Sequence, residues 1–177
     1  TITNELLKAI PPAKDYSYDF VAVDVETATG SINSICQIAL VGSRNGELEE
    51  LFSSLVQPPN NEIWESNSAI HGIYPDQTLK APSFPVVWDQ ISQYFSNLVV
   101  AHNASFDYRI LRTEFKRLGY DFQAKTLCTV ELSKKLIPDQ PSYSLGKLVR
   151  ALGIPMADRH RASGDAMATT KLFKMLL

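Results

Sequence analysis

The chain has 177 residues, of which 45% are hydrophobic, and this is enough apolar surface for one domain with a substantial core. The sequence contains neither a run of 18 apolar residues nor a charged and then apolar leader, so we expect a soluble domain without a membrane partner. The formal net charge of −2 argues against strong nonspecific attraction to a nucleic-acid duplex, because proteins that bind in this way usually carry a basic patch.

The cysteines and the ends of the chain bear on its cellular context. Cys36 and Cys128 lie in apolar, strand-like segments without a metal-binding spacing to a histidine, so we expect buried free thiols and a reducing cytoplasm. The sequence begins at Thr1 rather than at Met and stops within a predicted helix. We therefore expect residues 1–177 to form a single domain that could have been excised from a longer chain.

The first half of the chain is dominated by predicted strands. Short turns that are polar or contain glycine separate these segments, which is typical of an antiparallel meander. We expect strands at about 18–25, 35–42 and 47–56. Pro58 and Pro59 end the meander, and short helices are expected at about 62–69 and 84–96.

The second half alternates between predicted strands and helices. We expect a strand at 98–102, a helix at 104–118, a strand at 125–128, and helices at 129–136, 144–151 and 163–176. Alternation of this kind implies parallel strands joined by right-handed crossovers. The sequence therefore predicts an α/β fold with three layers.

Two carboxylates stand at the end of the first predicted strand. The run from Phe20 to Glu26 is rich in β-branched residues, and strand geometry places Asp24 and Glu26 on the same face. Two ionised carboxylates this close would repel each other and raise a pKa unless a cation lay between them. A hard divalent cation with oxygen ligands is the natural partner. The alternative interpretation is the solvated end of an edge strand.

Asp107 interrupts the apolar face of a predicted helix. Helical periodicity places it near the middle of an arc that is otherwise mainly apolar, although Glu114 also falls in this arc. In the alternative interpretation, an acidic residue in the first turn, behind an Asn103 cap, complements the helix dipole. That alternative explains the axial position of Asp107 but not its inward direction.

The last predicted helix also begins with an inward carboxylate. Ser163 is the expected N-cap, and Asp165 shares a face with Ala168 and Leu172. Because an uncompensated buried carboxylate is strongly unfavourable, we expect a cation or strong donors beside at least one of these aspartates. His160 lies just before this helix. It is either a solvated surface residue or a base that takes a proton from metal-bound water.

Three motifs in order resemble those of a known family. D-x-E-T at 24–27, H-N-x-x-F-D at 102–107 and H-x-x-x-x-D at 160–165 are similar to the motifs of the DEDDh branch of DnaQ-like 3′-to-5′ exonucleases. This family includes the proofreading subunit and exonuclease domains of bacterial replicative polymerases. The resemblance extends to segments 34–38, 70–73 and 152–154. It implies a ribonuclease H-like fold with a five-stranded mixed sheet flanked by helices.

The resemblance also implies roles for the polar residues. Asp24, Glu26 and Asp165 look like the ligands of the metal that binds the nucleophilic water. Asp107 looks like the holder of a second metal, to which Asp24 forms a bridge. His160 looks like the general base.

Substrate contacts are expected from four further positions, which are Thr27, His71, Asn103 and Phe106. His71 also fits a plain turn, and the helical phase of Phe106 favours core packing over stacking on a base. The stretch from Thr27 to Gly30 departs from the family's common E-T-T-G by one inserted residue. This difference bears on the loop under the terminal nucleotide but not on the metal ligands.

The chemistry that fits these residues is metal-dependent hydrolysis of phosphodiester bonds at DNA 3′ ends, with release of nucleoside monophosphates. Four oxygen ligands without cysteine favour two Mg²⁺ or Mn²⁺ ions over zinc. Without the four ligand carboxylates, 17 basic residues face 15 acidic ones, and the net charge changes from −2 to +2. We therefore expect metal-dependent binding of a few nucleotides at a single-stranded or frayed end.

Two other functions fit parts of the same pattern. A 3′-to-5′ exoribonuclease would use the same residues, and contact with the 2′-hydroxyl group would distinguish it. A non-catalytic nucleic-acid-binding module could keep the fold, although the complete set of five catalytic-type residues argues against this. The family resemblance also raises a polymerase partner or further domains as a hypothesis.

Overall fold

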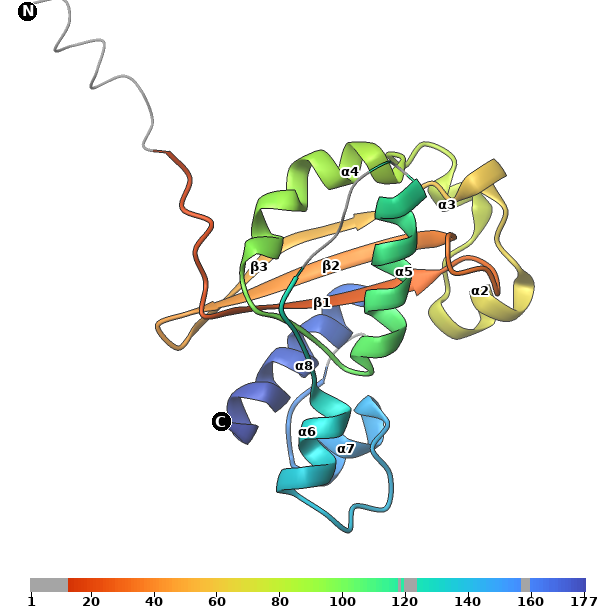
Figure 1. Cartoon of the computed structure of the whole chain (residues 1–177). Coiled ribbons are helices and arrows are strands. Elements are labelled where there is room, and N and C mark those ends of the chain that lie inside the picture. The colour runs from red at the N-terminus through yellow and green to blue at the C-terminus, as the bar shows by residue number, and fades with distance from the viewer. Residues whose placement is uncertain (1–12, 118, 120–123, 157–159) are drawn as a thin grey trace, which may run out of the picture.

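A five-stranded mixed sheet lies between two layers of helices (Figure 1). The computed structural model describes residues 13–117, 119, 124–156 and 160–177. The strand order across the sheet is β3-β2-β1-β4-β5. The strands are β1 (Phe20–Thr27), β2 (Ile35–Arg44), β3 (Glu47–Leu55), β4 (Val99–Ala101) and β5 (Thr126–Cys128).

The directions of the strands follow from their connections. Short turns join β1 to β2 and β2 to β3, and both pairs are antiparallel. Helices separate the later strands, and β4 pairs parallel with both β1 and β5. The meander predicted for the first half and the parallel strands predicted for the second half are therefore confirmed, as is the α/β class.

The helices are α2 (Glu65–His71), α3 (Pro75–Thr78), α4 (Phe84–Ile91), α5 (Ala104–Arg117), α6 (Thr129–Leu136), α7 (Leu145–Ala151) and α8 (Ala162–Leu176). Three expectations need correction. The short helix α3 was not expected, and the helix expected at 84–96 becomes a 3-10 helix at Ser92–Ser96. Helix α8 begins one residue early, so its N-cap is Arg161 and Ser163 lies inside its first turn.

The two faces of β1 contact different helices. Val21, Val23 and Val25 belong to the main core together with residues of α4 and α5. On the other face, Phe20 packs edge-on against Phe173 of α8, with ring centroids 4.7 Å apart. Side chains alternate along a strand, so Asp24 and Glu26 share the face of Phe20. The predicted split between the carboxylates and the valines is therefore confirmed.

Two further expectations concern the cysteines and membrane-spanning helices. Cys36 and Cys128 are both free; Cys36 is buried as expected, whereas Cys128 is only partly buried. Within the described part of the chain, no helix has the length and apolar character needed to cross a membrane.

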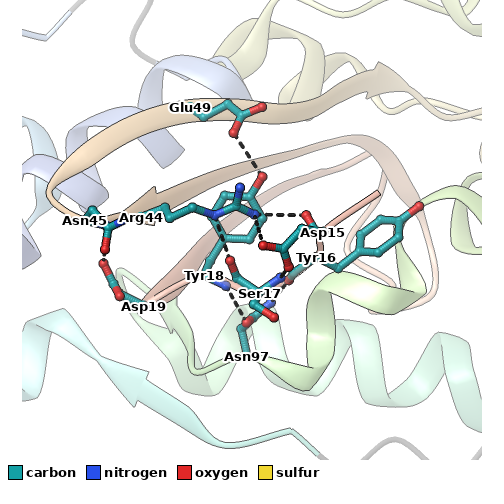
Figure 2. Close-up of polar contacts among 9 residues, drawn as sticks. All are labelled: Asp15, Tyr16, Ser17, Tyr18, Asp19, Arg44, Asn45, Glu49 and Asn97. Carbon is teal, nitrogen blue, oxygen red and sulfur yellow. Dashed lines mark hydrogen bonds and ion pairs between the residues drawn. The ribbon is translucent and has the colours of Figure 1, made fainter. Parts of the chain in front are cut away.

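Arg44 fastens the segment that precedes β1 (Figure 2). Its guanidinium donates to the backbone carbonyls of Ser17 and Asp15, each at 2.9 Å, and lies 4.2 Å from the ring centroid of Tyr18. The Tyr18 hydroxyl donates to Glu49 at 2.9 Å. These contacts hold the start of β1, at the end of the strand opposite to Asp24 and Glu26.

Gly42 of β2 supplies the space for the Tyr18 ring. A Cβ atom at Gly42 would lie 2.6 Å from a ring carbon of Tyr18 and 2.9 Å from a methyl carbon of Leu51. Because Arg44 and Glu49 hold the ring, we expect Gly42→Ala to lower the free energy of unfolding by about 1–3 kcal/mol, as overpacking does elsewhere. Urea denaturation measures this loss.

A double-mutant cycle assigns the cause. Arg44→Ala frees the Tyr18 ring, so the loss caused by Gly42→Ala should be smaller in the Arg44→Ala background. Equal losses in the two backgrounds would contradict the role given to the Arg44 contact.

Candidate metal centre

Three carboxylates meet at the C-terminal end of β1. Asp24 and Glu26 come from the strand, and Asp165 comes from the first turn of α8, which packs across β1 and β2. One carboxylate oxygen of each residue lies within 4.8 Å of those of the other two, and all three side chains are partly buried. Within the described part of the chain, no other group of three histidine, cysteine or acidic side chains meets in this way.

Asp107 borders this group from a different element. It lies in the first turn of α5 with only 4% of its surface exposed, which confirms the predicted inward direction. The backbone N–H of Val25, between the two strand carboxylates, forms a hydrogen bond to Asp107 that lowers its pKa. Asp107 is close enough to the group for its negative charge to raise the pKa of both Asp24 and Glu26.

Burial and neighbouring charges disfavour ionisation of Asp24, Glu26 and Asp107. Burial, and then the charges of Asp107, Glu26 and Asp165, raise the pKa of Asp24 well above its ordinary value. Burial, followed by the charges of Asp165 and Asp107, raises the pKa of Glu26 to about 8. Burial is also the main reason that the pKa of Asp107 rises to about 7. Without a cation, this site therefore holds protons near neutral pH.

The donor atoms suit a hard divalent cation. The Oδ2 atom of Asp24 is buried and has no hydrogen-bonding partner among the described residues. A buried carboxylate oxygen of this kind is unfavourable unless a cation or a donor compensates it. All the acidic side chains that meet here offer oxygen, which Mg²⁺ and Mn²⁺ prefer. The residues therefore fit the predicted type of metal.

His160 lies immediately before α8, two residues from its first residue. Its backbone is left-handed, with φ 59°, a conformation that is uncommon outside glycine but that asparagine, aspartate and histidine adopt more often than other residues do. The side chain is partly buried. The neighbouring Arg161 donates to the carbonyl of Gly72 at 3.4 Å, and its positive charge lowers the pKa of Glu26. The segment that carries His160 is thus tied to the end of α2.

His71 is buried and contacts the backbone with both ring nitrogens. Its Nδ1 accepts from the N–H of Ile73 at 3.1 Å, so the ring proton is on Nε2, which donates to the carbonyl of Thr27 at 3.1 Å. Burial lowers the pKa of His71, in agreement with a neutral ring. Asn67 also donates to the Thr27 carbonyl, at 3.0 Å. These bonds hold the backbone just after Glu26.

The Cys36 thiol lies beside both Glu26 and His71. Its thiol donates to the carbonyl of Glu26 at 3.4 Å and lies 3.7 Å from Nε2 of His71. Burial and the negative charge of Glu26 raise the pKa of Cys36 to about 12. The pairing of β1 with β2 also shifts register here, between Glu26 and Thr27. Such irregularities are common beside active sites because they redirect the chain.

The other expected substrate contacts lie around this strand end. Thr27 is the last residue of β1, and Asn103 is exposed, with a left-handed φ of 69°, where β4 passes into α5. In the stretch from Thr27 to Gly30, which has one more residue than the family's common motif, the N–H of Thr29 donates to Ser34 Oγ at 3.1 Å. The side chain of Phe106 lies outside the described residues. Contact of these residues and of His71 with a substrate stays a prediction.

Sequence reasoning missed the role of His102, which precedes Asn103. Its Nε2 donates to the carbonyl of Tyr143 at 2.7 Å, so Nδ1 accepts from the hydroxyl of Thr129, at 2.8 Å. The histidine therefore connects the end of β4 to α6 and to the loop before α7. Its place in the H-N-x-x-F-D motif was the available signal, but its partners are 27 and 41 residues away in the sequence.

Comparisons with known proteins agree with this geometry. A family model described as Exonuclease (RNase_T) matches residues 21–173. DNA polymerase III PolC-type of Thermotoga petrophila is 33% identical over 175 residues, which cover 92% of this chain and 13% of that protein. The 3′-5′ exonuclease DinG of Staphylococcus epidermidis is 32% identical over 157 residues, which cover 86% of this chain and 17% of that protein. The chain thus spans only a small part of the length of these curated relatives.

Solved structures share the arrangement of the chain. Exonuclease X, in complex with 5′ overhanging duplex DNA, is 29% identical with a TM-score of 0.72, and the match covers 89% of this chain and 90% of that one. Cell-death related nuclease 4 has a TM-score of 0.75 at 19% identity, over 90% of this chain and 64% of that one. The second likeness concerns the fold alone. Together with the sheet order, these structures confirm the ribonuclease H-like fold.

The raised pKa values predict how pH affects the stability of the metal-free protein. A group whose pKa is higher in the folded state stabilises the fold at low pH, and this stabilisation is lost as pH rises through the folded-state pKa. For Glu26 the two values are 4.5 and about 8. In EDTA, we therefore expect the melting temperature to fall by at least about 4 °C between about pH 5 and pH 8.

Two variants and one addition test the origin of this fall. Glu26→Gln should flatten the pH profile, whereas Glu131→Gln, which changes an exposed carboxylate, should not. Mg²⁺ or Mn²⁺ should raise the melting temperature more at pH 8 than at pH 6, because the cation competes with protons. A flat profile for the unaltered chain in EDTA would contradict the mutual repulsion of the carboxylates.

Proposed function

Because the chain belongs to the exonuclease family that matches residues 21–173, we propose that it hydrolyses DNA from 3′ ends with the help of divalent metal ions. The observation that carries the proposal is the meeting of the Asp24, Glu26 and Asp165 carboxylates within 4.8 Å. Three acidic side chains this close together, with the pKa values of Asp24 and Glu26 raised, are unfavourable for stability on their own. They make a good site for cations that bind phosphate oxygens.

The carboxylates divide between two cations in this proposal. Asp24, Glu26 and Asp165 would hold one Mg²⁺ or Mn²⁺ ion, and Asp107 with Asp24 would hold a second. When bound, the ions supply a lowered pKa for water and neutralise negative charge on the phosphate and on the leaving 3′ oxygen. The protein's own part is to keep four oxygen ligands close together in spite of their repulsion.

His160 acts as the general base in this proposal. Its imidazole takes the proton that the attacking water loses and passes it to solvent. Support comes from its position two residues before the first residue of α8, the helix that carries Asp165. The link from Arg161 to the Gly72 carbonyl, at 3.4 Å, limits how far this segment can move from the site.

DNA is the proposed substrate because of the relatives. One is named as a DNA polymerase III, and Exonuclease X is described in complex with duplex DNA. The net charge of −2 favours a small contact at a strand end over a long duplex interface. Thr27, His71, Asn103 and Phe106 are proposed to contact the terminal nucleotides. A polymerase partner is proposed from the PolC-type relatives alone, and a cytoplasmic location from the free thiols.

The decisive assay compares matched DNA and RNA oligonucleotides, single-stranded and double-stranded, each labelled at the 5′ end. We expect stepwise shortening of DNA from the 3′ end with Mg²⁺ or Mn²⁺, release of mononucleotides, and no reaction in EDTA. Asp24→Asn should lower turnover by at least about 100-fold, because it weakens the shared cation ligand.

Each alternative has its own outcome in this assay. Selective degradation of RNA would reverse the substrate assignment while leaving the chemistry intact. Binding of either nucleic acid without hydrolysis would favour a non-catalytic module. Unchanged turnover in Asp24→Asn would contradict the metal assignment.

The general base is tested by His160→Asn. Asparagine tolerates the left-handed conformation observed at His160, so this variant removes the imidazole with little added backbone strain. We expect kcat to fall by about 10²–10⁴-fold with little change in KM, in single-turnover assays at pH 8. An equal loss of affinity and turnover, or a large fall in melting temperature, would indicate a structural role for His160 instead.

A further inference from the structure

Gln37 is a buried polar residue that joins the sheet to the start of α8. It lies on β2 directly opposite Glu26 in the strand pairing, and only 8% of its surface is exposed. Its side-chain Oε1 accepts a buried hydrogen bond from the backbone N–H of Ala162 at 3.0 Å. The two residues are 125 positions apart in the sequence.

The N–H of Ala162 needs a partner from outside the helix. The first N–H groups of a helix have no carbonyl partner within it, and the N-cap Arg161 makes no side-chain capping bond. Ala162 is fully buried, so water cannot take this place. An unsatisfied buried N–H here would be unfavourable, because it loses its hydrogen bonds to water without a replacement.

Small side chains bring α8 close to β2 at this point. Ala39 of β2 packs with Ala162 and Ala166 of α8, and all three are fully buried. Flat contacts between methyl groups permit close approach, but they resist sliding of the helix along its axis only weakly. A directional hydrogen bond fixes the axial position, because its strength falls steeply with distance and angle.

The position of Ala162 determines that of the site residues on α8. Asp165 follows it by one turn, and its N–H donates to the carbonyl of Arg161 at 3.0 Å. His160 precedes it by two residues. Through a rigid helical turn, a shift of Ala162 therefore becomes a shift of the Asp165 carboxylate against Asp24 and Glu26.

We propose that Gln37 is a positioning residue that holds the first turn of α8 where Asp165 completes the carboxylate group with Asp24 and Glu26. Its effect on metal binding requires only the carboxylate cluster, whereas its effect on turnover rests on the proposed function. A neutral amide suits this place because a carboxylate would add a further negative charge across from Glu26.

The test compares three variants by a metal-binding measurement. Gln37→Met has a similar length but lacks the amide oxygen, and Gln37→Glu keeps an acceptor. Thr170→Val is the matched control, because it removes another buried hydrogen bond of α8, from the Thr170 hydroxyl to the Ala166 carbonyl at 2.8 Å, and leaves the bond between Gln37 and Ala162 in place. We expect Gln37→Met to weaken Mn²⁺ binding, measured by calorimetry, by about 10–100-fold.

Amide hydrogen exchange and kinetics supply the other readouts. Exchange at Ala162 should be faster in Gln37→Met and close to that of the unaltered chain in Gln37→Glu and Thr170→Val. Thr170→Val should lower the melting temperature without weakening Mn²⁺ binding. In nuclease assays at saturating Mn²⁺, Gln37→Met should lower kcat more than it raises KM, and Gln37→Glu should recover part of the loss.

Three results would overturn the role of Gln37. They are unchanged Mn²⁺ affinity in Gln37→Met, unchanged exchange at Ala162, and an equal loss of affinity in Thr170→Val. Failure of the proposed function is a separate result. If the unaltered chain cleaves no nucleic acid but the Mn²⁺ and exchange differences are as expected, the positioning role stands and the nuclease proposal falls.

Discussion

Repulsion among four carboxylates is the constraint on which the rest of this structure depends. Asp24, Glu26, Asp107 and Asp165 come from one strand and two helices, and the charges of the other three all raise the pKa of Asp24. Electrostatic repulsion alone would separate these side chains. Here the surrounding backbone is held from several sides, by His71 and Asn67 at the end of β1 and by Gln37 at the start of α8. These hydrogen bonds hold the carboxylates close together in spite of their repulsion.

The two faces of β1, and its two ends, have different roles in stability and in the candidate site. The valine face of β1 belongs to the large apolar core with α4 and α5, whereas the opposite face carries the carboxylates beneath α8. Arg44 and Tyr18 fasten the start of the same strand. The contacts at the start of β1 thus stabilise a strand whose other end carries carboxylates that repel one another. Because the strand is rigid, fixing its start also helps to fix the carboxylate end.

The sequence predicted the parts of this arrangement that depend on local periodicity. Alternation along β1 placed Asp24 and Glu26 together, and helical phase turned Asp107 inward. Predictions from local propensity were wrong where tertiary contacts determine the ends of an element. At the start of α8, Ser163 was the expected N-cap, but Arg161 takes that position. The roles of Gln37, His71 and His102 were not predictable, because each depends on hydrogen bonds to residues far away in the sequence. Only the assembled sheet brings these partners together.

The buried thiol of Cys36 gives the site a chemical preference. It donates a hydrogen bond to the Glu26 carbonyl, and its pKa of about 12 keeps it protonated at neutral pH. Soft metals such as zinc and copper bind thiolate far better than thiol. The protonated Cys36 thiol is therefore a weak ligand for such metals. The carboxylate oxygens of Asp24, Glu26 and Asp165 are thus the anionic ligands that this strand end offers to a cation.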